Sequence, residues 1–190
     1  MLSEAKYFSD TCPLVAPMTI RKATLISNPK TGRYASRRLR PIQEVASSLE
    51  SLGITVDLRL TSGPGEATQL AARAARNGSS EIIVAGGDGT INEVIQGLAG
   101  TKARLAIIPR GTGNVLAREL GLPLDDAQAV AVAAKGNSRK IYLGLAIDEA
   151  TNERRHFVLM AGIGLDASVV KRVQPSLKNE SAKERFGFRD

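Results

Sequence analysis

The stretch Ile82-Ile83-Val84-Ala85-Gly86-Gly87-Asp88-Gly89-Thr90-Ile91-Asn92-Glu93 decides how this chain folds. It begins with β-branched apolar residues, which predict a buried strand. Three glycines then fall within four positions, and apolar residues return at helix spacing from Ile91 to Leu98. The pattern therefore predicts a strand that ends in a sharp turn, followed at once by a helix.

The turn itself has the composition of a phosphate-binding loop. Glycines let the backbone approach a ligand closely, and a helix N-terminus offers unpaired N–H groups and partial positive charge. Asp88 is the only ionisable residue of the turn, and a carboxylate there can hold Mg²⁺ through water or accept a proton. The loop is neither a Walker A loop nor a Rossmann fingerprint. A single turn of this composition is more often a tight turn with a solvated aspartate than a ligand-binding loop. The other loops of the chain are therefore needed to choose between these two interpretations.

Strands and helices alternate on both sides of this stretch. We expect further strands at 23–27, 54–60 and 103–109. Helices are expected over a face from Leu39 to Leu52, over 66–77, after Thr90, over 115–120 and from Asp125 to about Gly136. This order predicts a doubly wound parallel α/β domain over residues 23–137. The loops 28–32, 86–90 and 110–114 would lie at strand carboxyl ends, where open α/β sheets bind ligands.

The periodicity changes after Gly136. Residues 139–147 and 156–161 read as the two strands of a hairpin around a polar turn at 148–155. We interpret residues 138–190 as the incomplete beginning of a β-rich second domain, and residues 1–22 as a loose leader.

Composition narrows the class of partner. The chain has 190 residues, a formal charge of +7 and a pI of about 9.9, which favours anionic partners. Aromatic residues make up only 4% and Trp is absent, which argues against a nucleic-acid partner. One cysteine and one histidine cannot form a disulfide or a common zinc site. Without an evident signal peptide or spanning segment, we expect a cytoplasmic protein.

Four ordered motifs together resemble one family. They are Asn28-Pro29-Lys30-Thr31-Gly32, Gly86-Gly87-Asp88-Gly89-Thr90, Pro109-Arg110-Gly111-Thr112-Gly113-Asn114 and Ala161-Gly162-Ile163-Gly164-Leu165-Asp166-Ala167. In this order the chain resembles the catalytic domain of the diacylglycerol kinase family, which includes sphingosine and ceramide kinases and bacterial lipid kinases. NAD kinases share the Gly-Gly-Asp-Gly motif and the sheet, but the first and third motifs favour the lipid kinases.

The resemblance implies an ATP- and Mg²⁺-dependent transfer of a phosphoryl group to a lipid hydroxyl at a membrane surface. It implies a cytoplasmic protein peripheral to the membrane and leaves a homodimer open. Asp88 would be catalytic, or would hold Mg²⁺ through water. The nucleotide would contact Asn28, Thr31, Gly32, Thr61, Gly86, Gly87, Asp88, Gly89, Thr90, Ile91, Asn92, Glu93, Gly111, Thr112 and Asn114.

The sequence departs from this family in three ways. Val115 and Tyr142 stand where many members carry aspartates that support a hydrated Mg²⁺ network. The third departure is length, because family members continue through a second domain that supplies another catalytic carboxylate. The alternatives are therefore an NAD kinase-like phosphotransferase or a nucleotide-binding fragment without turnover. The arginines from Arg33 to Arg40 would attract phosphate or an anionic membrane.

Overall fold

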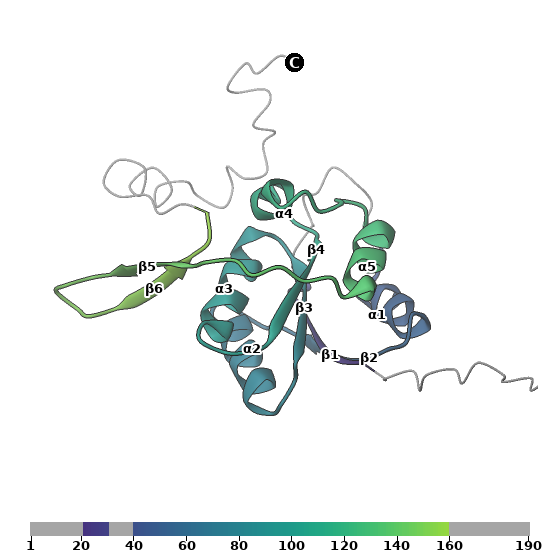
Figure 1. The fold of residues 1–190 in the computed structure, drawn as a ribbon, viewed down its shortest axis with the longest axis horizontal. Coiled ribbons are helices and arrows are strands. Elements are labelled where there is room, and N and C mark those ends of the chain that lie inside the picture. The colour runs from purple at the N-terminus through teal and green to yellow at the C-terminus, as the bar shows by residue number, and fades with distance from the viewer. Residues whose placement is uncertain (1–20, 31–39, 160–190) are drawn as a thin grey trace, which may run out of the picture.

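Four of the six described strands form one parallel sheet, shown with the rest of the fold in Figure 1. The computed structural model describes residues 21–30 and 40–159. The sheet contains β1 (Arg21–Ser27), β2 (Ile54–Leu60), β3 (Glu81–Gly86) and β4 (Arg104–Pro109), in the order β2-β1-β3-β4. β3 is buried along its whole length, and so is β1 from Ala23 onwards. Burial on both faces explains their continuous apolar runs.

Helices cover both faces of this sheet. On one face α1 (Ile42–Ser51) and α5 (Asp126–Lys135) form a core with the strands, which includes Val45 of α1 and Val130 of α5. α2 (Glu66–Arg76) and α3 (Asp88–Leu98) lie on the other face. The short α4 (Val115–Glu119) contributes Leu116 to the core on this face. The doubly wound α/β fold predicted from the sequence is therefore confirmed.

The strand order places a switch point next to β1. The chain runs from β1 outward to β2 on one side, and then returns to β3 on the other side of β1. The connections that leave β1 and β3 therefore diverge toward opposite faces of the sheet. Open α/β sheets bind ligands in the crevice that this divergence creates at the carboxyl ends of the strands.

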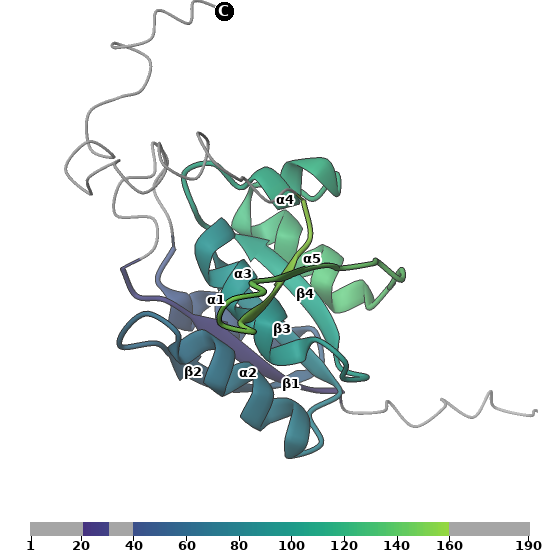
Figure 2. The same cartoon turned by 90° about the vertical axis from the view of Figure 1, so that its left-hand side faces the viewer.

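A two-stranded hairpin follows the sheet and packs against α3. α5 ends at Lys135 and is capped by Gly136, whose φ of 69° suits glycine. Residues 137–143 then lead to β5 (Gly144–Ile147) and β6 (Arg154–Phe157). The Gln96 amide of α3 donates to the His156 carbonyl at 2.8 Å and accepts from its N–H at 2.9 Å. This pairing holds the outer edge of β6 to α3; Figure 2 views the molecule from the hairpin side.

Several boundaries differ from the sequence predictions. α1 begins only at Ile42, because Pro41 at its N-cap has no N–H to donate and disfavours helix at the residue before it. Leu52 lies beyond the last turn of α1 and is 52% exposed, so its placement on the buried face was wrong. The strand expected over 139–147 covers only 144–147, because no described strand pairs with residues 139–143.

The second hairpin strand spans 154–157, where 156–161 was expected. β1 begins at Arg21, so residues 21 and 22 of the leader expected over 1–22 belong to the first strand instead. Several sequence predictions lie outside the described residues: residues 1–20 of that leader, Thr31, Gly32, the arginines at 33, 37 and 38, and the motif at 161–167. Within the described ranges, none of the helices has the length and apolarity that crossing a membrane requires.

Candidate functional site

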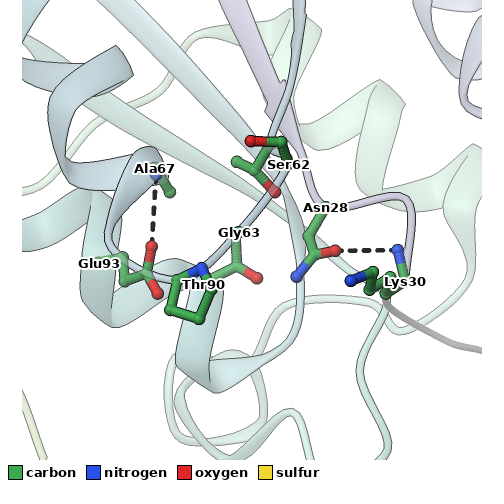
Figure 3. A pocket seen from close by; sticks show the side chains of 9 residues that line it. Asn28, Lys30, Ser62, Gly63, Ala67, Thr90 and Glu93 are labelled. Atoms are coloured by element: carbon green, nitrogen blue, oxygen red, sulfur yellow. Dashed lines mark hydrogen bonds between the residues drawn. The ribbon is translucent and has the colours of Figure 1, made fainter.

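A small cavity lies where the loops after β1 and β2 meet the first turns of α2 and α3 (Figure 3). Its volume is about 210 Å³. The lining residues are mainly small, polar or charged: Asn28, Lys30, Thr61, Ser62, Gly63, Pro64, Ala67, Thr90 and Glu93. All belong to connections at strand carboxyl ends or to the helices that follow, so the cavity occupies the crevice predicted by the switch point.

Backbone hydrogen bonds fix the polar residues on the β1 and β2 side of the cavity. The Asn28 side-chain oxygen accepts from the Lys30 N–H at 2.9 Å, which closes a turn directly after β1. The Thr61 N–H donates to the Ser27 carbonyl at 2.9 Å and extends the pairing of β2 by one residue. Thr61 is consequently held at the cavity wall with only 5% of its surface exposed.

Glu93 links α3 to the start of α2. Its carboxylate accepts from the Ala67 N–H at 3.3 Å, and its backbone carbonyl accepts from the Thr68 hydroxyl at 2.8 Å. Ala67 is in the first turn of α2, where N–H groups lack partners within the helix. A carboxylate therefore occupies the positive end of α2, inside the cavity and beside Thr90 (Figure 3).

The loop between β2 and α2 is closed by Ser62 and Glu66. The Ser62 hydroxyl and N–H both donate to the Glu66 carboxylate at 2.6 Å. Both hydrogen bonds lower the pKa of Glu66 below its ordinary value of 4.5, and the bond from the Ser62 hydroxyl has the larger effect. The Glu66 carboxylate therefore holds the loop in the conformation that lines the cavity, and Glu66 itself does not line the cavity.

The glycine-rich loops after β3 and β4 touch one another. A Cβ added at Gly111 would lie 2.5 Å from the Gly87 Cα, so the two backbones approach as closely as only glycine permits. Asn114 closes the second loop, because its amide accepts from the Gly111 N–H and donates to the Gly111 carbonyl, both at 2.8 Å. Asn114 is 2% exposed and has a φ of 50°, a conformation that asparagine tolerates.

Asp88 ties the two loops together. One carboxylate oxygen accepts from the Val115 N–H and the other from the Leu116 N–H, each at 3.1 Å. These N–H groups belong to the first turn of α4, whose N-cap Asn114 makes no side-chain capping bond. Asp88, although remote in sequence, therefore caps α4. The sequence pattern did not reveal this function of the side chain.

A buried ion pair anchors the β4 loop from the other face of the sheet. The Arg110 guanidinium lies 3.7 Å from the Asp126 carboxylate, and both side chains are buried. Arg110 also donates to the carbonyl of Arg40. The loop that carries Gly111 is therefore attached to α4 on one side and to α5 on the other.

The described residues do not form a metal site made by protein groups alone. Among them there is no cluster of three or more His, Cys, Asp or Glu side chains. Both oxygens of Asp88 already accept backbone N–H bonds. The Val115 side chain offers no oxygen ligand, and Tyr142 lies outside the strands with 88% of its surface exposed. The donor set thus does not fit a Mg²⁺ ion held by protein alone.

The structure brings together some of the predicted site residues and separates others. Asn28, Thr61, Thr90 and Glu93 meet in the cavity. Outside it, Gly87 approaches Gly111, the Gly86 carbonyl accepts from the Arg110 N–H, and Asp88 accepts from the two N–H groups that follow Asn114. Ile91 is buried in the core, Asn92 bonds to Gln96 on the surface of α3, and Gly89 and Thr112 are exposed.

Sequence reasoning missed Lys30, Ser62, Gly63, Pro64 and Ala67 as lining residues. One signal could have found most of them. Ser62, Gly63 and Pro64 follow a strand that was itself predicted, and strand carboxyl ends carry the ligand contacts of this class of sheet.

The sheet, its switch point and the paired glycine-rich loops define an open α/β protein whose candidate site lies at the carboxyl edge of the sheet. Residues 22–146 match the family "Diacylglycerol kinase catalytic domain". The match covers more than half of the chain, and the chain belongs to this family.

Curated relatives agree with this family. The chain is 34% identical over 160 residues to "Diacylglycerol kinase" of Staphylococcus carnosus (strain TM300), covering 83% of this chain and 50% of the relative. It is 35% identical over 162 residues to "Diacylglycerol kinase" of Bacillus subtilis (strain 168), covering 84% and 51%. It is 34% identical over 160 residues to "Probable lipid kinase YegS-like" of Pseudomonas putida, covering 83% and 50%. The chain spans about half the length of these relatives.

Solved structures show the same fold. A diacylglycerol kinase structure from Bacillus anthracis str. Sterne superposes with a TM-score of 0.57 at 30% sequence identity, covering 66% of this chain and 43% of that one. The α/β architecture of the family is therefore shared by this chain.

Proposed function

We propose that this chain is the nucleotide-binding part of an ATP-dependent lipid kinase, which transfers the γ-phosphoryl group to a lipid hydroxyl. The observation that carries the proposal is the cavity at the switch point, where Asn28, Thr61, Thr90 and Glu93 meet from three separate connections. These four are among the fifteen positions that the family resemblance assigns to the nucleotide. The relatives named diacylglycerol kinase and lipid kinase support the lipid as acceptor class.

The charges divide the proposed site into two parts. Glu93 places a negative charge in the cavity, which would repel phosphate but would accept hydrogen bonds from ribose hydroxyls. Asn28 and Thr61 add neutral hydrogen-bonding groups. The phosphates would lie toward the glycine-rich loops and the exposed Lys30, which offer backbone N–H groups and a cation. The Asp88 carboxylate between these loops is already engaged by two N–H groups of α4.

The reaction requires ATP and the lipid hydroxyl to be held in line, because positioning and charge stabilisation supply most of the catalysis in phosphoryl transfer. Mg²⁺ normally reaches kinases together with the nucleotide, coordinated by its phosphates. The close contact between the Gly87 and Gly111 loops would orient the phosphate chain. Asp88 accepts two N–H bonds from α4. A catalytic or metal-supporting role for the same carboxylate stays a prediction. Peripheral membrane association of a cytoplasmic enzyme belongs to the same proposal.

A binding experiment tests the nucleotide site. Calorimetric titration with Mg-ATP should give a measurable affinity, and Thr61→Val, which replaces the hydroxyl by a methyl group of similar size, should weaken it about two- to tenfold. Thr55→Val is the matched control, because Thr55 is exposed on the same strand and does not line the cavity. Equal affinities in the two variants would place the nucleotide elsewhere.

A turnover experiment tests the acceptor. The chain is incubated with γ-labelled ATP, Mg²⁺ and vesicles that contain diacylglycerol, ceramide or sphingosine, with NAD in a parallel reaction. Label in a lipid supports the lipid kinase, whereas label in NAD supports the NAD kinase-like alternative suggested by the shared Gly-Gly-Asp-Gly motif. ATP binding without any labelled acceptor would support a nucleotide-binding protein without turnover.

A further inference from the structure

A second and larger hollow lies along the open edge of β4, away from the proposed nucleotide cavity. We call it the β4 groove; its volume is about 930 Å³, within the range of pockets that hold small-molecule ligands. β4 pairs only with β3 among the described strands, so its other edge borders the groove. The apolar wall contains Leu105 and Ile107 of β4, Leu116 and Leu120 at α4, Val132 of α5 and Ile141 of the 137–143 connection.

The charges around the β4 groove are strongly unequal. Four cationic residues line it, namely Lys102, Arg104, Arg139 and Lys140, and all four are exposed. Glu81 is the only acidic lining residue, and its buried carboxylate is already engaged by Arg21 and Arg104. The groove therefore offers an anion a positive rim and an apolar interior within reach of that rim.

We propose that the β4 groove binds one anionic amphiphile with a single acyl chain, such as a fatty acid or a lysophospholipid. The chain would lie against the apolar wall, and the carboxylate or phosphate would lie at the cationic rim. This division buries the methylene groups while the charged head keeps both water and cationic partners. Val132 and Ile141, which are 41% and 42% exposed, would be covered by the bound chain. The proposal does not depend on phosphoryl transfer.

The charge pattern distinguishes this ligand from the competing occupant, a polypeptide strand added to β4. Strand addition depends on backbone hydrogen bonds and requires no net charge in the added segment. An anionic amphiphile, in contrast, uses both the apolar wall and the cations. Affinity that depends on the head-group charge as well as on the chain length is therefore the signature to measure.

Fluorescence titration of the whole chain with cis-parinaric acid, below its aggregation concentration, measures binding directly. Displacement by saturated fatty acids should strengthen by up to about fourfold per added methylene group. Dodecanol should displace the probe at least about threefold less well than dodecanoate, because it lacks the charge. Equal displacement by the two compounds, or no dependence on chain length, would overturn the proposal.

Two pairs of variants locate the site. Val132→Asp places a negative charge in the groove, and Ala131→Asp makes the same change at an exposed neighbour that does not line it. Arg139→Glu with Lys140→Glu is compared with Arg154→Glu and Arg155→Glu on β6, which also lie outside the groove. The first member of each pair should weaken probe binding about tenfold or more, and its control less than about twofold.

Gel filtration with light scattering completes the test. A monomer at all concentrations, with the variant pattern above, supports the amphiphile. A dimer that Val132→Asp converts to monomer, and that excludes the probe, would show that a second copy covers β4 and would overturn the proposal. Equal loss of probe binding in a variant and its control would also overturn it.

Discussion

Removing the Asp88 carboxylate tests whether this residue holds the two glycine-rich loops together. Asp88→Ala deletes two acceptors of backbone N–H bonds, at 3.1 Å to Val115 and 3.1 Å to Leu116. Loss of a helix cap costs about 0.5–2 kcal/mol, and the half-buried, doubly bonded position of Asp88 argues for about 2 kcal/mol. For a domain of this size, that loss lowers Tm by about 4–8 °C.

Asp125 provides the matched control. It caps α5 with one bond, in which the Gln128 N–H donates to its carboxylate at 3.1 Å, and it lies outside the cavity. Asp125→Ala should therefore cost about 1 kcal/mol. Thermal unfolding, with and without Mg-ATP, compares the two variants. Asp88→Ala should lose both stability and the rise in Tm on adding nucleotide, while Asp125→Ala should keep the rise.

Amide hydrogen exchange gives a direct readout of the capping bonds. In Asp88→Ala the N–H groups of Val115 and Leu116 should exchange faster, because they lose their acceptors. If the exchange of these N–H groups is unchanged and the Tm of Asp88→Ala is no lower than that of Asp125→Ala, the hydrogen bonds between the loops contribute nothing measurable to stability. The reasoning that makes Asp88 the link between the two loops would then be refuted.

Three further predictions concern other parts of the fold. Gly111→Ala should destabilise the protein by about 1–3 kcal/mol in urea unfolding, because its Cβ would overlap the neighbouring loop, whereas Gly89→Ala, with open space around it, should cost nothing or stabilise α3. Ser62→Ala should raise the pKa of Glu66 toward 4.5 in an NMR titration. The lowered pKa of Glu66 stabilises the folded parent protein at neutral pH, and this contribution is lost as pH falls through the pKa of Glu66 in the folded state, so the parent and the variant should become equally stable at low pH. Gln96→Leu should release the hairpin from α3 and speed proteolysis at its turn while the sheet stays folded; an unchanged cleavage rate would contradict this.

Local sequence rules predicted the elements of the sheet well. The apolar runs ending at Ser27 and Gly86 could only be strands buried on both faces, and β2 was placed with its observed boundaries. The predicted start of α1 was wrong because helical apolar spacing and the effect of proline pointed to different residues. Its apolar spacing continued through Leu39, but Pro41 fixed the start of the helix. The strand at 139–143 failed because alternation predicts a strand only where a partner supplies hydrogen bonds.

The sequence by itself determined the α/β class, the glycine-rich loops and the family, because these depend on residue type and on spacing within one connection. Only the tertiary structure decided how separate connections meet. It showed Thr61 and Glu93 in one cavity, the Asp88 carboxylate on the N–H groups of α4, and cations around the open edge of β4. Contacts between residues distant in sequence depend on strand order and helix placement, and no local pattern encodes the partner of a side chain.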